Sequence, residues 1–425
     1  MKIDVNIDVH HLTRVEGHGN IKVRIKNGIV EEARWDIVET PRYFEVMLKG
    51  KHFTSAGILT ARICGICSIG HCLASVSATE DAFGIEIPPL AAKLRLLAKH
   101  GETLQSHILH LLFLAAPDFL DIESAIPLMN INPDVFQVAG RLKGLSNRLC
   151  DAVAGRTTHP VSIQVGGMAR VPDKKTLNGL RNDLDSALDD LKKVSDLFST
   201  FELPAFTRET EFVSLKDEGA YPWIGGTIIS TDGVEKDKHE YLALTNEYVT
   251  DRNTSKWCKL SRESFVVGAL ARFNNNHHLL HSEARNVAAN LGLLPICHNP
   301  YMFNVAQLVE CVHVAHESID LIEDILNTTD ALDPIAPVEP CAGKGTGAVE
   351  VPRGILYHHY EYDDQGRIVR ADCVIPTTQN NANIHYDIQN LAKEYALRGT
   401  TDVELERLCS MLVRAYDPCI SCSVH

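Results

Sequence analysis

The chain has 425 residues, of which 45% are hydrophobic, and this is enough to bury a large core. Its formal net charge of −14 at pH 7 argues against nucleic acid or an anionic membrane surface as the main partner. No apolar stretch of about 18 residues is free of charged side chains, so the sequence predicts no membrane span.

The N-terminal part, up to about residue 60, is expected to be rich in β-structure. Residues 1–10 alternate apolar and polar side chains, which is typical of a strand and unlike a signal peptide. Two further strand-like runs, 20–24 and 29–38, flank the dipeptide Asn27-Gly28. Asn-Gly between two such runs is the strongest short signal for a β-hairpin.

The middle part, residues 61–333, is predicted to be a helical core because apolar residues recur there at helical spacing. Pro88-Pro89 is expected to open the first helix and Pro117 to end it. The predicted helices cover residues 90–116, 134–154, 174–201, 260–291 and 304–328.

The C-terminal part, residues 334–425, is predicted to combine a hairpin with two helices. Its first segment, 334–352, is rich in Pro and Gly and is interpreted as a connector. A hairpin is expected next, with strands at 354–362 and 367–375 joined by a polar turn.

The final helices follow this hairpin. One is predicted over 386–396, and the last begins at Thr401, which forms a capping-box pattern with Glu404. Asp417-Pro418 is expected to stop it. Together the elements indicate a mainly α fold with small β-sheets (α+β), in a single domain of residues 1–425.

Twelve cysteines are scattered along the chain. In a long sequence without a signal peptide, this distribution favours reduced thiols over a disulfide framework. A cytoplasmic location is therefore expected, although a protein exported as the passenger of a signal-bearing partner would have the same features.

Two Cys-x-x-Cys pairs, Cys64/Cys67 and Cys419/Cys422, lie at opposite ends of the chain. Thiolates favour soft metals such as zinc, iron and nickel, so the two ends are predicted to meet around a metal site. A structural zinc is one alternative, but zinc ribbons place their pairs only about 15–20 residues apart. A thioredoxin-like redox pair is disfavoured because no βαβ pattern surrounds either motif.

The flanks of the first pair indicate a redox-active metal. Arg62 and His71 bracket the pair, and a zinc ribbon has no need of them. A histidine N–H donated to a bridging sulfur tunes such a metal.

With these flanks, the chain resembles the large subunit of nickel–iron hydrogenases. The resemblance runs in order from residue 12 to the last residue. Its motifs are Arg14–His18, Arg62–Cys67 with His71, Pro352–Gly354, Pro376–Asn380 and Asp417–His425.

The resemblance implies a reversible heterolytic cleavage of H2. Cys64 and Cys419 would be terminal ligands of nickel, and Cys67 and Cys422 would bridge nickel to an iron that carries carbon monoxide and cyanide. The proton would pass to a nearby base, Cys419, and then to Glu16. Without the resemblance, Glu16 is equally well explained as a surface charge at a strand end.

The resemblance also assigns three residues around the metals. Arg353 would lie over their open side, paired with Asp417, and Thr377 would donate its hydroxyl to a cyanide. The alternative for Arg353 is an ordinary salt bridge. Many family members carry an acidic residue where this chain has Ser106, a departure shared by soluble, cofactor-coupled members. His107 and His110 are expected either to contact the site or to pack in the core.

A second metal, magnesium or iron, is implied near the C-terminus. Its ligands would be Glu45, a backbone carbonyl near Cys373, and His425. A chain that ends on this histidine resembles the processed form of the family.

Partners are implied because the remaining cysteines lack the clustered spacing of iron–sulfur ligands, and no Gly-x-Gly-x-x-Gly fingerprint is present. The resemblance implies a small hydrogenase subunit with iron–sulfur clusters, and flavin-bearing subunits that reduce NAD(P) or another soluble carrier. The alternatives are an H2 sensor, another non-catalytic member of the superfamily such as a quinone-site subunit, and a structural zinc protein with four cysteine ligands.

Overall fold

The computed structural model describes residues 3–328 and 334–425. It confirms a mainly α protein with small, separate β-sheets. The predicted end of the helical core at residue 333 and the first two residues of the N-terminal pattern lie outside the described residues. None of the described helices is both long and apolar enough to cross a membrane.

The helices and strands have the following bounds. The helices are α1 (Phe44–Leu48), α2 (Phe53–Thr60), α3 (Ser68–Phe83), α4 (Pro89–Leu109), α5 (Ala116–Phe119), α6 (Leu128–Ile131), α7 (Pro133–Ala154), α8 (Lys174–Phe198), α9 (Tyr241–Thr245), α10 (Ala269–Asn276), α11 (Ser282–Asn290), α12 (Phe303–Asn327), α13 (Pro376–Arg398), α14 (Asp402–Ala415) and α15 (Ile420–Ser423). The strands are β1 (Val5–Val9), β2 (Gly19–Lys26), β3 (Ile29–Ile37), β4 (Ile163–Gln164), β5 (Gly167–Met168), β6 (Glu211–Lys216), β7 (Thr227–Ser230), β8 (Glu235–Lys236), β9 (Phe265–Val266), β10 (Gly343–Val351), β11 (Gly354–Tyr362) and β12 (Ile368–Val374). Within the described ranges they form the sheets β1-β2-β3, β4-β5, β8-β7-β6-β9 and β10-β11-β12.

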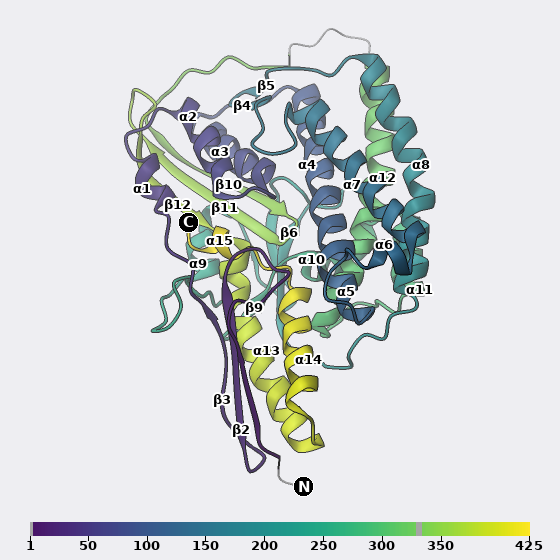
Figure 1. The fold of residues 1–425 in the computed structure, drawn as a ribbon. Helices are drawn as coiled ribbons and strands as arrows, with labels where there is room; N and C mark the ends of the chain where they lie inside the picture. Colours follow the sequence, from purple (N-terminus) through teal and green to yellow (C-terminus); the bar gives the residue numbers. More distant parts are fainter. Residues whose placement is uncertain (1–2, 329–333) are drawn as a thin grey trace.

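The predicted N-terminal hairpin is confirmed. Asn27 and Gly28 both have positive φ angles, as a tight turn between β2 and β3 requires. The antiparallel sheet β1-β2-β3 lies beside α13 and α14, and together they form the narrow lower end of the molecule (Figure 1). Trp35 on β3 is fully buried in this contact. At the other end of this sheet, the loop between β1 and β2 lies at the centre of the molecule, next to the C-terminal segment (Figure 1).

His385 on α13 makes the stability of this contact depend on pH. Its Nδ1 lies 3.3 Å from the Trp35 amide N–H, which donates to it, and burial lowers the pKa of the ring from 6.5 to about 4. Between about pH 6.5 and 4, the imidazole of His385 binds a proton in the unfolded protein but not in the folded protein. Stability therefore falls as the pH falls through this window. At about 1.4 kcal/mol per pKa unit, the loss is at most about 3.5 kcal/mol.

The measurement is the urea midpoint between pH 4 and 7. His385→Gln, which does not titrate, is expected to remove part of the acid-side loss. A variant whose midpoints follow the wild-type pH dependence would contradict this expectation.

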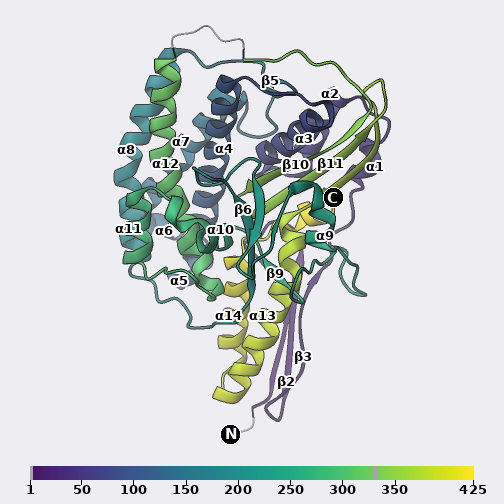
Figure 2. The same cartoon turned by 180° about the vertical axis from the view of Figure 1, so that it is seen from behind.

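The helical core is a layer of long helices, α4, α7, α8 and α12, packed on one another (Figures 1 and 2). The predicted spans at 134–154, 174–201 and 304–328 match α7, α8 and α12 closely. The predicted end of the first helix at Pro117 is wrong. The helix continues as a π-helical stretch, η2 (His110–Ala115). Pro117 then lies in the first turn of α5, where its missing N–H does not remove a hydrogen bond.

The predicted helix at 260–291 is also wrong, because this segment is divided. It contains β9, then α10, then α11. Gly268 has a φ of 111° just before α10, a conformation that a helix interior does not allow. Two asparagines near the end of α10, Asn275 and Asn276, donate to Ser214 on β6, so a strand forms beside the helix.

Strands occur in two segments where none were expected, the helical core and the connector. The four-stranded sheet β8-β7-β6-β9 lies inside the predicted helical core, and β10 occupies the second half of the predicted connector at 334–352. Glycines at 343, 345 and 347 suggested a loop, but they face α3: a Cβ at Gly347 would lie 2.1 Å from the Ala74 carbonyl oxygen. The strand lacks side chains there because the α3 backbone lies directly against it.

The elements after β10 follow the predicted order. The hairpin of β11 and β12 is confirmed, and α14 begins with the Glu404 amide donating to Thr401 Oγ1 at 3.2 Å. The helix predicted at 386–396 is longer, because α13 already begins at Pro376. Arg353, just before β11, and Thr377, just after β12, therefore lie at the same open end of the hairpin.

Candidate metal centre

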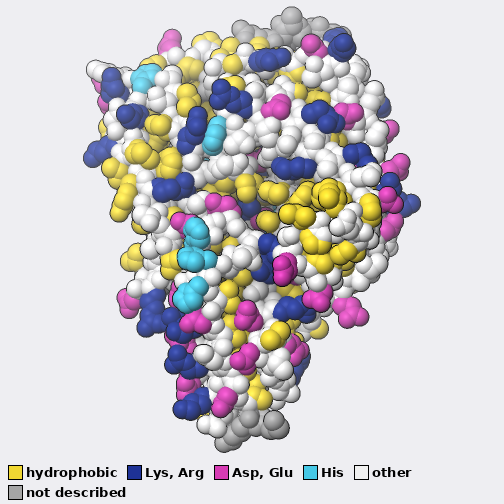
Figure 3. Space-filling view, viewed as in Figure 1, with side chains coloured by type: hydrophobic (Ala, Val, Ile, Leu, Met, Phe, Trp, Pro, Cys, Tyr) yellow, Lys and Arg dark blue, Asp and Glu magenta, His cyan; other side chains and the backbone are white. Residues whose placement is uncertain are grey.

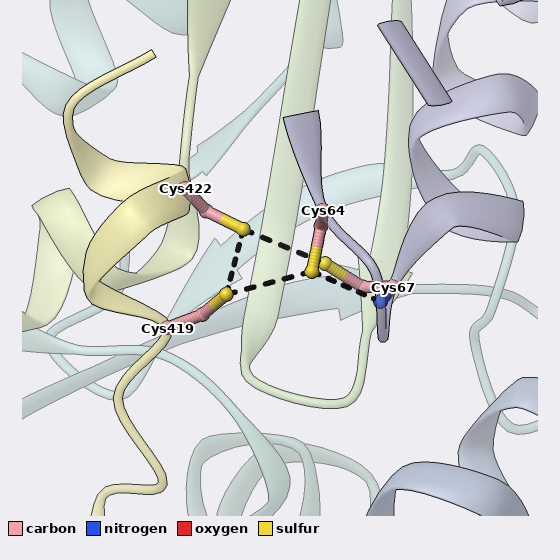
Figure 4. A group of neighbouring side chains, drawn as sticks. All are labelled: Cys64, Cys67, Cys419 and Cys422. Atoms are coloured by element: carbon pink, nitrogen blue, oxygen red, sulfur yellow. Dashed lines mark hydrogen bonds between the residues drawn. The ribbon is translucent and has the colours of Figure 1, made fainter. Parts of the chain in front are cut away.

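The sulfur atoms of the four motif cysteines lie within 4.8 Å of one another (Figure 4). Cys419 Sγ is 3.5 Å from Cys64 Sγ and 2.6 Å from Cys422 Sγ. Cys422 Sγ is 3.9 Å from Cys67 Sγ. All four residues are buried, and no other group of three or more metal-ligating side chains occurs in residues 3–328 and 334–425.

Backbone contacts hold the two ends of the chain together at this cluster. The Ile420 amide donates to the Glu16 carbonyl at 3.0 Å, forming a bridge between the β1–β2 loop and the C-terminal segment. Gly17 has a φ of 85°, and a Cβ there would lie 2.7 Å from Ile420 Cβ. Close packing and the positive φ therefore require glycine at position 17, next to Glu16.

The charges of the cluster favour a bound cation. Hydrogen bonds from the Cys419, Cys422 and Cys67 thiols lower the pKa of the Cys64 thiol well below its usual value, while burial raises the pKa of the Cys422 thiol well above it. One thiolate is thus stabilised by its neighbours, but four buried thiolates repel one another. Soft metal ions remove this repulsion, so the donor set fits nickel and iron.

Glu16 faces this cluster from the β1–β2 loop. Its Oε2 lies 3.3 Å from Cys419 Sγ and accepts the Ser421 amide N–H at 3.0 Å, and the Ser421 hydroxyl donates to Oε1. The side chain is half-buried, so it links the sulfur to the protein surface. Ser421 carries no sequence signal of its own, because it is one of the two variable residues between Cys419 and Cys422.

His71 on α3 is buried near the first pair, and burial lowers its pKa to about 4, so the ring is neutral at pH 7. Its partner within the described residues is His358 on β11, with Nδ1 and Nε2 3.2 Å apart, not a cysteine sulfur. His358 Nδ1 in turn lies 2.7 Å from the Tyr360 hydroxyl. His358 was not predicted as a site residue, since the sequence of β11 indicates only a strand.

Arg353 and Thr377 approach the cysteines from the open end of the β11–β12 hairpin. Arg353 is buried, its Nη2 donates to Asp417 Oδ1 at 2.7 Å, and its Nε donates to the Asp417 carbonyl oxygen. Thr377 Oγ1 accepts the Cys419 amide N–H at 2.9 Å, which leaves its own proton free to donate. The buried charge of Arg353 needs the nearby carboxylate of Asp417, because a buried charge without a partner is strongly destabilising.

Comparison with known proteins decides the family. A family profile described as nickel-dependent hydrogenase matches residues 42–133 and 231–425, and a HoxL-like profile matches residues 6–40. The chain belongs to the nickel-dependent hydrogenase family. It is the catalytic large subunit of a nickel–iron hydrogenase.

Relatives match over nearly the whole chain. The sulfhydrogenase 1 subunit alpha of Pyrococcus furiosus is 33% identical, covering 99% of this chain and 97% of the relative. The NAD-reducing hydrogenase HoxS subunit beta of Cupriavidus necator is 29% identical, covering 97% and 93%. These matches decide against the alternative of a structural zinc protein.

Solved structures agree. An NAD+-reducing [NiFe]-hydrogenase in the H2-reduced state has a TM-score of 0.88 at 28% identity, covering 99% of each chain. A [NiFeSe] hydrogenase of Desulfovibrio vulgaris has a TM-score of 0.78 at 23% identity, covering 99% of this chain and 100% of the other. The second match shows the shared fold.

Ser106 stands where many hydrogenases of this family carry an acidic residue. It lies beside Arg353, with its Oγ 3.5 Å from Arg353 Nη1. The two nearby histidines contact other core residues. His107 Nε2 is 2.7 Å from Glu310 Oε2, and His110 Nδ1 is 2.6 Å from the Gln307 side-chain oxygen. They therefore lie one layer behind the metal site.

The residues implied in a second metal site also meet. His425 Nε2 lies 3.5 Å from Glu45 Oε1, and the Cys373 amide donates to the same oxygen at 2.8 Å. The nearby His425, opposing the effect of burial, lowers the pKa of Glu45 to about 2, so the carboxylate is ionised. An ionised carboxylate beside an imidazole nitrogen suits a divalent cation. Cys373 contributes its N–H here.

Proposed function

We propose that this subunit cleaves H2 reversibly and heterolytically at a nickel–iron centre held by its four motif cysteines. Cys64 and Cys419 would bind nickel alone, and Cys67 and Cys422 would bind both nickel and iron. When bound, such a centre, with carbon monoxide and cyanide on its iron, polarises H2 and accepts its electrons. The convergence of four buried sulfurs from both ends of the chain supports this proposal.

The proton is proposed to leave through Cys419 and Glu16. Glu16 Oε2 lies within hydrogen-bond reach of Cys419 Sγ, and the two donors of Ser421 hold the carboxylate in that orientation. Because Glu16 is half-buried, a proton accepted there can pass on to solvent.

The polar residues around the cysteines are proposed to orient the centre. Arg353, fixed by Asp417, would present its guanidinium to the open side, and Thr377 would donate to a cyanide nitrogen, which needs a partner in a buried pocket. His71, buried near the first cysteine pair, would adjust the electron-donating strength of the sulfurs without a direct hydrogen bond to them. Glu45 and His425 are proposed to bind magnesium or iron, with a backbone carbonyl near Cys373.

Electrons are proposed to pass to a small subunit with iron–sulfur clusters. The relatives are named as subunits, and the described residues hold no second cysteine cluster. A cavity of about 430 Å³ beside the first cysteine pair is lined by Arg62 and His159, among others, and Ile58 and Val161 in its lining are more than half exposed. Figure 3 shows hydrophobic side chains gathered across the middle of this face between charges of both signs, an arrangement compatible with the apolar core and polar rim of a protein interface.

Beyond the small subunit, flavin-bearing subunits are proposed to reduce NAD(P) or another soluble carrier in the cytoplasm. The likeness to a NAD+-reducing hydrogenase supports this acceptor. We also propose that residues 1–425 form one domain, because both ends supply ligands to one centre.

Metal analysis tests the proposal. The purified chain is expected to contain nickel and iron at about one each, and its infrared spectrum is expected to show bands of metal-bound carbon monoxide and cyanide. Zinc alone would contradict the assigned centre. Slow turnover by a chain with both metals would favour the H2 sensor instead.

A further inference from the structure

Arg272 on α10 is a fully buried arginine that the proposed chemistry does not use. All five of its N–H groups have acceptors. Nε and Nη2 donate to the two oxygens of Glu310 at 2.6 and 2.7 Å, and Nη1 donates to Glu350 at 2.8 Å. The remaining two N–H groups donate to main-chain carbonyl oxygens, of Val351 at 2.9 Å and Pro352 at 3.1 Å.

Those two carbonyls belong to the turn that presents Arg353. Val351 pairs with Gly354, so Pro352 and Arg353 form a two-residue turn between β10 and β11. Carbonyls in such a turn usually face water, but these are buried and need donors from the protein. Arg272 supplies an N–H donor to each of these two carbonyls, which directly precede Arg353 in the chain.

The start of α10 also lies directly against this turn. A Cβ at Gly268 would come within 3.0 Å of the Arg353 carbonyl oxygen, and one at Gly354 within 2.4 Å of Val267 Cγ2. The helix that carries Arg272 and the turn that carries Arg353 are therefore in backbone contact, and a shift of one moves the other.

The charges around Arg272 explain why arginine is needed. Glu310 also accepts from the Tyr221 hydroxyl at 2.8 Å and contacts His107. Although burial opposes its ionisation, the guanidinium of Arg272 holds the pKa of Glu310 well below its usual value. A lysine would keep the positive charge, but its single nitrogen cannot span two carboxylates and two carbonyls.

We propose that Arg272 is a positioning residue: it fixes the Pro352–Arg353 turn and, through it, the guanidinium of Arg353 over the cysteine cluster. The inference rests on the proposed role of Arg353. A displacement of about 1 Å at such a group can cost on the order of 100-fold in rate.

The test compares Arg272→Lys with Arg95→Lys in the holoenzyme. Arg95 is a matched control, since it is also buried, donates twice to one carboxylate, Glu80, and donates to the carbonyls of Gln164 and Gly167. Both variants are expected to lower the melting temperature. Only Arg272→Lys is expected to lower kcat by about tenfold or more and to shift the infrared bands of the cyanides, with the KM for the electron-accepting dye unchanged.

The proposal is overturned if Arg272→Lys matches Arg95→Lys in kcat and in band positions. If Arg272→Lys does not accumulate, Glu310→Gln is measured instead. It removes the charge that holds Nε and Nη2, and wild-type bands and kcat in that variant would overturn the proposal.

Arg353→Lys separates this inference from the proposed function. A large loss of turnover in Arg353→Lys together with a wild-type Arg272→Lys would reject the positioning role alone. Wild-type turnover in Arg353→Lys would reject both the role of Arg353 and the inference built on it.

Discussion

Replacing Cys419 by serine is expected to abolish H2-dependent turnover while leaving the helical fold largely intact. A hydroxyl is a hard, weakly acidic ligand, and it cannot replace a thiolate on a soft metal. Cys419 Sγ also faces Glu16 Oε2 at 3.3 Å, so the substitution removes a metal ligand and the start of the proposed proton route together. The measurements are H2-dependent reduction of a viologen dye, nickel and iron content, and far-ultraviolet circular dichroism.

Cys409→Ser is the matched control. Cys409 lies on α14, is fully buried, and is not one of the four clustered cysteines. Burying a hydroxyl there costs about 1–3 kcal/mol of stability, but turnover per folded molecule should remain. Wild-type turnover in Cys419→Ser would show that the ligand assignment is wrong.

Replacing Glu16 by glutamine is expected to lower turnover by about 100-fold or more. Positioned acid–base groups contribute roughly 10²–10⁴-fold to such rates, and the amide cannot take up the proton. Glutamine keeps the size of the side chain and an oxygen for the Ser421 N–H, so the loop should keep its position. Nickel and iron content and the infrared bands are expected to stay close to those of the wild type.

Glu39→Gln provides the comparison for this variant. Glu39 is close in sequence, and its Oε1 lies 2.6 Å from Nδ1 of the exposed His18. Its loss should leave turnover unchanged. Full turnover in Glu16→Gln would mean that the proton leaves by another route, while loss of metal in that variant would point to a role in assembly.

The metal-binding motifs could be identified from the sequence because their information is local. Each cysteine pair carries its own spacing and flanks, and the capping of α14 at Thr401 depends on residues within one turn. The hairpin at Asn27-Gly28 was predictable for the same reason, since both residues readily adopt positive φ.

Two of the wrong predictions concern segments whose structure depends on distant parts of the chain. The glycines of β10 have the composition of a loop, yet they form a strand because α3 packs against their backbone. The segment 260–291 has helical spacing, yet Gly268 and the neighbouring β6 divide it. In both places a contact between distant segments overrides the local preference.

Residue identity and spacing were enough to predict which cysteines gather at the candidate metal centre and which family the chain resembles, because soft-metal chemistry is a property of the side chains themselves. The partners of those side chains depended on the folded chain. That His358 faces His71, that Ser421 holds Glu16, and that Arg272 supports the turn of Arg353 are pairings between remote segments. Such pairings arise when buried polar groups must find partners, and packing of the whole chain decides which groups are in reach.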